Sequence, residues 1–92
     1  MADAVQVQQS AMFKRAYKRI HQNQKADMDD AVADIVREPS IGEAKKGDLA
    51  GVLVHKFKCN DQLMLLAYEY DPGTRLLLLL GSHENFYRDL KR

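Results

Sequence analysis

The chain has 92 residues and a formal net charge of +1 at pH 7, values that describe one small domain, expected over residues 1–92. A domain of this size buries about 60–65% of its unfolded surface, so it builds one modest core and no large internal pocket. The near-neutral charge argues against a polyanion-binding surface over the whole molecule. A lone cysteine, Cys59, excludes an internal disulfide and fits a reducing compartment. Because no leader-like or long apolar segment occurs, we expect a cytoplasmic protein without membrane contact.

The N-terminal part of the chain predicts one strand and two helices. Residues 4–8 alternate apolar and polar side chains, the period of a strand with one buried face. From Ser10 onward, apolar residues recur at helical spacing and basic residues fill the opposite side. The apolar positions are Phe13, Ala16, Tyr17 and Ile20, and the basic positions are Lys14, Arg15, Lys18 and Arg19. A second helix, with its N-cap expected at Asn23, must end near Glu38 because Pro39 cannot continue it.

The acidic residues of the second helix have a structural interpretation. Asp27, Asp29 and Asp30 are expected in its first turn, where the helix dipole favours negative charge. Adjacent helical carboxylates point in different directions, so they do not form a metal site together. No Cys/His spacing typical of a metal site occurs either, and we expect neither metal nor cofactor.

The C-terminal half predicts three strands joined by tight turns, an antiparallel meander. Residues 40–50 form a loop with a short strand near Ala44, and the strands follow at residues 52–59, 63–70 and 76–80. The first strand places Val52, Val54, Lys56 and Lys58 on one face and Leu53, His55, Phe57 and Cys59 on the other. In the turn between the last two strands, Gly73 is expected to have positive φ.

The five consecutive leucines of residues 76–80 predict an interior strand that is buried on both faces. After it, Gly81 permits a sharp change of direction and Ser82 can cap a last helical turn. The helix pair is the only element available to cover the apolar face of the sheet. The predicted fold is α+β, with a two-helix hairpin packed on a mainly antiparallel four- to five-stranded sheet and a short C-terminal helix.

This order of elements resembles the RelE/ParE superfamily of toxins from bacterial type II toxin–antitoxin systems. The resemblance depends on residues 13–15, 46–52 and 81–87, and the last stretch is similar to the YafQ-like ribonuclease branch. It implies a toxin that is inhibited by a cognate antitoxin protein. The ribonuclease branches cut messenger RNA on the ribosome without a metal, whereas the ParE branch inhibits DNA gyrase. Fold alone does not decide between these activities.

Three side chains are candidate catalytic groups if the chain cuts RNA. His83 can take and give a proton near neutrality, because an imidazole has an unperturbed pKa of about 6.5. Tyr87 would lie one helical turn away, at a position where the YafQ-like pattern has Phe. Lys56 can neutralise the charge that develops on a scissile phosphate. The alternative is structural: His83 is a solvated residue, and lysines on an edge strand prevent aggregation.

Four further residues are candidates for binding RNA or phosphate: Lys58, Arg75, Arg88 and His55. The face that His55 shares with Leu53 and Phe57 favours a partly buried histidine over a catalyst. The basic side of the first helix, Lys14, Arg15 and Lys18, is the candidate antitoxin-binding face, with a plain solvated surface as the alternative. Residues 62–66 supply no arginine where the RelE-type pattern has one, which favours a YafQ-like or a non-cleaving member.

Overall fold

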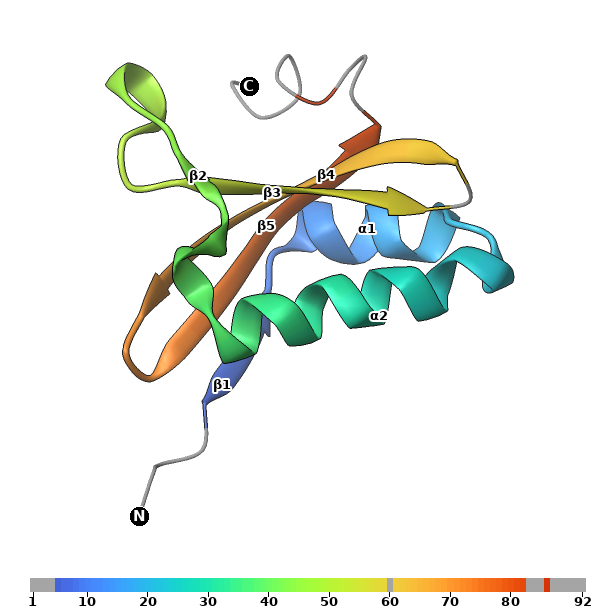
Figure 1. Cartoon of the computed structure of the whole chain (residues 1–92), viewed down its shortest axis with the longest axis horizontal. Helices are drawn as coiled ribbons and strands as arrows, with labels where there is room; N and C mark the ends of the chain where they lie inside the picture. Colours follow the sequence, from blue (N-terminus) through green and yellow to red (C-terminus); the bar gives the residue numbers. More distant parts are fainter. Residues whose placement is uncertain (1–4, 60, 83–85, 87–92) are drawn as a thin grey trace.

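The computed structural model describes residues 5–59, 61–82 and 86, in which two helices pack on one face of a five-stranded sheet (Figure 1). The elements in chain order are β1 (Gln6–Gln9), α1 (Ala11–Arg19), α2 (Gln22–Arg37), β2 (Glu43–Ala44), β3 (Leu53–Cys59), β4 (Gln62–Asp71) and β5 (Thr74–Ser82), with short 3-10 turns at Pro39–Ile41 and Gly47–Leu49. The strand order is β1-β5-β4-β3-β2, with β1 parallel to β5 and all other neighbours antiparallel. The predicted α+β fold is confirmed, and the predicted C-terminal helix lies outside the described residues except for Phe86.

Local hydrogen bonds set the beginning of each helix. Ser10 is the N-cap of α1: its Oγ accepts from the Phe13 N–H at 3.0 Å and donates to the Leu78 carbonyl at 2.5 Å, which ties α1 to β5. The N-cap of α2 is His21 rather than Asn23, and the His21 N–H donates to the Gln24 side chain at 3.1 Å. Because α2 begins earlier than predicted, the expectation of aspartates in its first turn is wrong.

The sheet has an apolar core on each face. The core on the helix side contains Phe13, Met28, Ile35, Cys59, Met64, Leu66, Tyr68, Leu77 and Leu80. The core on the opposite face contains Val52, Val54, Leu65, Ala67, Leu79 and Phe86. The expectation that only the helix pair covers apolar surface is therefore wrong, since Phe86 is 1% exposed and packs on the face without helices. Among the described residues, no helix is long and apolar enough to cross a membrane.

β5 is an interior strand between β1 and β4, as predicted. It is not evenly buried, because Leu77, Leu79 and Leu80 are buried whereas Leu76 and Leu78 are half-buried. The register explains the difference: Leu79 pairs with Ala67 and Leu77 pairs with Tyr68, which leaves Leu78 as an extra residue in a β-bulge. The bulge puts Leu77 and Leu80 in the helix-side core with Leu79 on the opposite face, and it offers the Leu78 carbonyl to Ser10.

The turn between β4 and β5 has a different conformation from the one predicted. Gly73 does not have positive φ; the described glycines that do are Gly47 (67°) and Gly51 (93°). Instead, the Asp71 carboxylate accepts from the Gly73 N–H at 2.9 Å, an Asx-type turn.

A buried tyrosine fixes the segment that leads into β2. The Tyr68 hydroxyl donates to the Pro39 carbonyl at 2.5 Å and accepts from the Gly42 N–H at 3.0 Å. A Cβ at Gly42 would lie 2.6 Å from that hydroxyl, so only glycine fits there. β2 therefore has a fixed position at the edge of the sheet beside β3.

Candidate functional site

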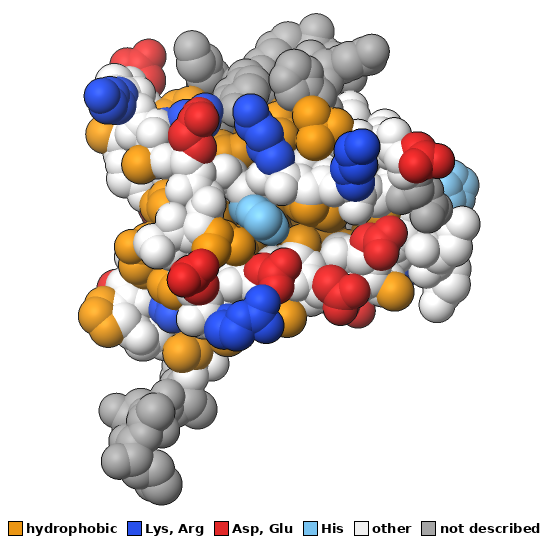
Figure 2. All heavy atoms as spheres, in the orientation of Figure 1, with side chains coloured by type: hydrophobic (Ala, Val, Ile, Leu, Met, Phe, Trp, Pro, Cys, Tyr) orange, Lys and Arg blue, Asp and Glu red, His pale blue; other side chains and the backbone are white. Residues whose placement is uncertain are grey.

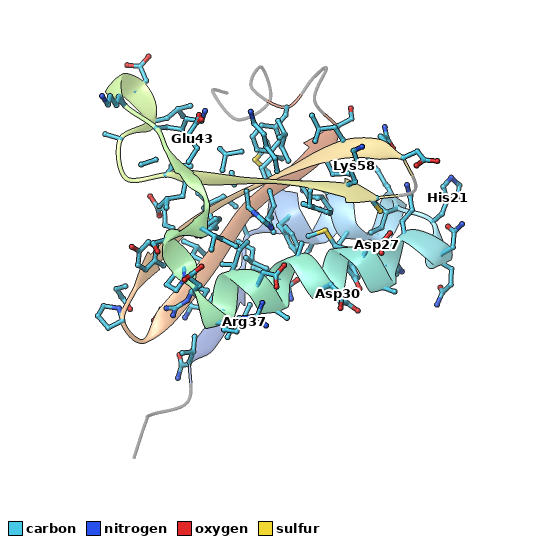
Figure 3. The ribbon with its side chains drawn as sticks, in the orientation of Figure 1. His21, Asp27, Asp30, Arg37, Glu43 and Lys58 are labelled. Atoms are coloured by element: carbon cyan, nitrogen blue, oxygen red, sulfur yellow. The ribbon has the colours of Figure 1, made fainter. Side chains whose placement is uncertain are left out.

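The sheet face opposite the helices, called the open face below, presents two lysines from β3. Lys56 and Lys58 are exposed there, on the same side of the strand as the buried Val52 and Val54, so the predicted alternation is confirmed. Figure 3 labels Lys58 on β3. In the register of the sheet, Lys56 lies beside Leu65, which lies beside Gly81 near the end of β5. With strands about 4.8 Å apart, the backbone of Lys56 is about 10 Å from Gly81.

Phe86 packs on the open face. A Cβ at Gly81 would lie 3.6 Å from the Phe86 ring, so the ring packs directly beside the end of β5. The predicted site residues His83, Tyr87 and Arg88 lie outside the described residues. Their neighbours in sequence are described: Ser82 ends β5, and Phe86 is buried against Leu65 and Leu79.

β2 brings an acidic side chain close to these lysines. Glu43 pairs with Val54 across the β2–β3 ladder, so its side chain is on the open face. A hydrogen bond from Lys45, the charge of Lys45 and the charge of Lys56 lower the pKa of Glu43. Lys56 therefore already lies near one carboxylate of its own chain.

Arg75 was a candidate phosphate ligand, but in the structure its side chain binds backbone carbonyls of its own chain. It is 5% exposed and points toward α2 rather than the open face. Its guanidinium donates to the carbonyls of Ile35 (3.3 Å), Val36 (3.2 Å), Asp71 (2.6 Å) and Thr74 (3.1 Å). The last carbonyls of a helix lack intrahelical partners, so Arg75 satisfies the C-terminal end of α2. A guanidinium committed in this way cannot hold RNA without breaking these bonds.

His55 lies on the opposite face of β3 from the two lysines. It is half-buried beside α2 and stacks on Phe57, with ring centroids 5.8 Å apart. Burial lowers the pKa of His55, and the charge of Asp34 opposes that shift. The lowered pKa favours the neutral form of this imidazole, and the sheet separates it from Lys56 and Lys58.

A groove runs along α1 to the ends of β4 and β5. Its volume is about 540 Å³. Its lining includes Met12, Arg15, Arg19, Ile20, His21, Gln24, Met64, Gly81 and Ser82. Of the three predicted antitoxin-binding residues, Arg15 lines this groove, while Lys14 and Lys18 are exposed elsewhere on α1. Arg19 also lines the groove; it was predicted on the basic side of the helix but was not among the three candidate antitoxin-binding residues, although its i, i+4 spacing from Arg15 places both guanidinium groups on one side of the helix. His21, to which the sequence assigned no role, lines the groove as well.

The sequence itself decides the family. A model of the ParE-like toxins of type II bacterial toxin–antitoxin systems matches residues 7–91. The chain belongs to this family. No match is found among curated proteins.

Solved structures share the fold of this ParE-like toxin. The RelBE2 toxin–antitoxin complex of Mycobacterium tuberculosis matches with a TM-score of 0.73 and 20% identity, over 88% of this chain and 100% of that chain. A mutant of the E. coli toxin RelE in the free state matches with a TM-score of 0.73 and 10% identity, over 97% and 94%. A YoeB/ParE toxin of Agrobacterium tumefaciens matches with a TM-score of 0.67 and 15% identity, over 86% and 99%. At these identities the likeness shows a RelE-like fold and nothing finer.

The described part of the ParE-like toxin offers exposed positive charge on β3. No group of three His, Cys, Asp or Glu side chains in that part is arranged to hold a metal ion. Lys56 and Lys58 are exposed cations on a rigid strand, and they can contact an anion such as a phosphate without moving the backbone.

Proposed function

We propose that this ParE-like toxin is a ribosome-dependent endoribonuclease that cuts messenger RNA in the cytoplasm without a metal ion or cofactor. The observation that supports it most is the open face, where Lys56 and Lys58 lie two strands from the end of β5. Directly after β5 the sequence supplies His83, and after the buried Phe86 it supplies Tyr87 and Arg88. The proposed site therefore combines the two cations of the open face with a proton-transfer group that follows β5 in the sequence.

The proposed reaction is an internal transesterification. The ribose 2′-oxygen attacks the adjacent phosphorus and loses its proton to a base, while the 5′-oxygen of the next nucleotide leaves and takes up a proton. The products are a 2′,3′-cyclic phosphate and a 5′-hydroxyl end, so no water or metal is consumed. His83 has the role of proton transfer. Lys56 stabilises the charge on the phosphate, Lys58 and Arg88 bind the flanking backbone, and Tyr87 stacks on a base.

One observation favours a second candidate, a ParE-like inhibitor of DNA gyrase that does no chemistry. β4 runs beside Lys56 and Lys58, yet none of its residues is basic. A ribonuclease that needed a guanidinium from the centre of the sheet would lack it here.

Induced expression separates the two candidates. For the ribonuclease, we expect new 5′-hydroxyl transcript ends within coding regions soon after induction, together with an arrest of translation. Plasmid supercoiling by gyrase should be unchanged by the purified toxin. Loss of supercoiling activity without new transcript ends would contradict the ribonuclease and support gyrase inhibition.

We also propose that a cognate antitoxin binds the α1 groove. The Mycobacterium tuberculosis RelBE2 structure is a toxin–antitoxin complex, and the present groove combines apolar and basic lining. It suits an amphipathic helix with acidic residues on one side.

Charge reversal tests this interface. The variant Arg15→Glu/Arg19→Glu reverses two charges that line the groove and should weaken antitoxin binding by about tenfold at low salt and by much less at high salt, because exposed charges are screened. Isothermal titration at two salt concentrations measures the effect. The variant Lys46→Glu, an equal change per residue in an exposed loop, is the control. Equal affinities for wild type and the double variant would remove this side of α1 from the interface.

A further inference from the structure

The free edge of β1 is uncharged. Within the described residues, β1 pairs with β5 on one side and has no strand on its other side. Its four residues, Gln6–Gln9, are all exposed, and none of them is charged or a proline. Charged side chains and prolines on an edge strand usually prevent it from pairing with another chain. Because β1 lacks both, its outer edge is open to a further strand.

The opposite side of the sheet differs, because charges of both signs surround β3. Lys56 and Lys58 are exposed on its open face, and the charge of Asp34 acts on His55 from the helix side. Figure 2 shows basic side chains over β3 and acidic side chains over α2. Like charges that lie opposite each other destabilise a strand pair. An identical strand can therefore join the sheet at β1 without the repulsion that it would meet at β3.

The backbone groups of β1 that point outward follow from its hydrogen bonds to β5. The N–H groups of Gln6 and Ser10 each donate to a carbonyl in or next to β5 at 2.9 Å. Backbone groups that point to one side belong to alternate residues of a strand. The N–H and C=O groups of Val7 and Gln9 therefore point away from β5.

These outward groups complement themselves about a two-fold axis. Residues that point at each other across an antiparallel pair exchange two N–H···O bonds. If Gln8 lies opposite Gln8 of a second copy, Val7 of each copy lies opposite Gln9 of the other, and both of these pairs can form their two bonds. The Gln8 backbone stays bonded to its own β5, so the sheet of each copy is left intact.

Val7 and Gln9 also line an apolar groove on the helix side of β1. The groove has a volume of about 350 Å³, and its other lining residues are Phe13, Tyr17, Asp29, Val32, Ala33 and Leu77. Val7 is 41% exposed here. In the two-fold arrangement, Val7 of the second copy would lie beside Gln9 on the same side of the sheet. It would cover part of this apolar surface, which favours association.

The lining of the groove narrows the choice of partner. Asp29 is its one charged lining residue, and the carboxylate accepts from the Tyr17 hydroxyl at 3.0 Å. A nucleic acid would meet no cation among the residues of β1 and the groove, and a charged peptide would find no opposite charge on β1. An uncharged strand with outward groups at the same spacing fits both the edge and the groove. β1 of a second copy is such a strand.

We propose that the ParE-like toxin forms a two-fold dimer in which the β1 strands of two copies pair antiparallel, with Gln8 on the axis. The two five-stranded sheets then form one continuous sheet. Both open faces point to the same side of it, because side chains that lie opposite each other across a strand pair share a face.

The dimer leaves both lysine pairs of the open faces accessible. Three strand spacings separate β3 from β1 in each copy, and one more crosses the axis. At about 4.8 Å per spacing, the two Lys56 backbones are about 34 Å apart along the sheet. Dimer formation therefore neither completes nor covers the proposed RNA site, so this inference goes beyond the proposed function and does not depend on it.

Hydrogen exchange at several protein concentrations tests the register. With the full-length toxin free of antitoxin, formation of the dimer should slow exchange of the Val7 and Gln9 amides about tenfold or more. The Gln6 and Ser10 amides, which already bond to carbonyls of their own chain, should change far less. Sedimentation equilibrium on the same samples should show a monomer–dimer equilibrium. A monomer at every concentration up to about 1 mM would overturn the proposal, and so would protection that begins only when antitoxin is added.

Substitutions of Gln8 place a charge on the proposed axis. Gln8→Lys and Gln8→Glu should each weaken the dimer about fivefold, because like charges would lie opposite each other. An equimolar mixture of the two variants should restore association. The same two substitutions at Gln22, an exposed residue at the start of α2, are the control and should leave the dimer unchanged. Equal association of all these variants would overturn the proposal.

A proline at position 9 tests the backbone bonds themselves. Gln9→Pro removes an N–H that points away from β5, so two of the bonds between the copies are lost and the dimer should weaken about tenfold or more. Thermal unfolding checks that the variant is folded; if it is not, the Gln8 variants decide. A dimer that persists in both Gln9→Pro and Gln8→Lys would use another surface and would also overturn the proposal.

Discussion

Replacing His83 with alanine is expected to lower the rate of transcript cleavage by about 10²–10⁴, the usual effect of removing a general acid or base. The imidazole is the one candidate catalytic group whose ordinary pKa lets it both accept and donate a proton near neutral pH. Growth arrest on induction should disappear with the cleavage. Mapping of 5′ ends after induction of wild type and variant at equal protein levels measures the effect.

The comparison with Lys58→Met separates chemistry from binding. Loss of a phosphate-gripping lysine should weaken RNA binding and reduce its salt dependence, whereas His83→Ala should leave both unchanged. Cleavage by wild type should persist in EDTA once the ribosome's own magnesium requirement is met. Full toxicity of His83→Ala with no new transcript ends would refute the ribonuclease proposal and make gyrase supercoiling the decisive assay.

The parts of the fold that could be predicted are those set by local periodicity. The helical spacing of Phe13 and Tyr17 gives α1, and the alternation from Val52 to Lys58 gives the two faces of β3. Such a pattern shows which side of a helix or strand faces the apolar core. It can be read from the residues of that helix or strand alone. The placement of Lys56 and Lys58 on one exposed face followed directly from the alternation.

The parts that could not be predicted depend on contacts between distant segments. The bulge at Leu78 is recognised only when β5 is aligned with β4, and the burial of Phe86 on the second face depends on packing with strand residues such as Leu65 and Leu79. A run of five leucines looks uniform, yet the bulge distributes it over two cores. The predicted N-cap of α2 was wrong for a different, local reason: the Gln24 side chain accepts from the His21 N–H three residues earlier, so the cap is not set by the identity of the capping residue alone.

Arg75 is the clearest case in which residue type misled. Arginine after a tight turn in a suspected nuclease suggested a phosphate ligand, but its partners are carbonyls at residues 35, 36, 71 and 74. Two of these carbonyls belong to the last turn of α2, 40 and 39 residues before Arg75 in the sequence. No local pattern in the sequence records that α2 ends beside the start of β5.

The structural role of Arg75 makes a large stability effect expected on substitution. Arg75→Met keeps much of the side-chain volume but leaves the carbonyls of Ile35 and Val36 without their donor at a buried position. Unsatisfied buried acceptors and lost charge-assisted hydrogen bonds together should lower the free energy of unfolding by about 2–4 kcal/mol. Urea denaturation at constant pH and salt measures the change.

Arg37→Met is the matched control, because it removes a guanidinium from the same end of α2. Arg37 pairs with Asp34 at 2.5 Å, yet its side chain is 73% exposed. Exposed ion pairs contribute about 0–1 kcal/mol, so this variant should be nearly as stable as wild type. RNA binding by Arg75→Met, measured below its unfolding transition, should match that of wild type. If Arg75→Met were as stable as Arg37→Met and bound RNA weakly, the guanidinium would serve RNA and not the end of α2.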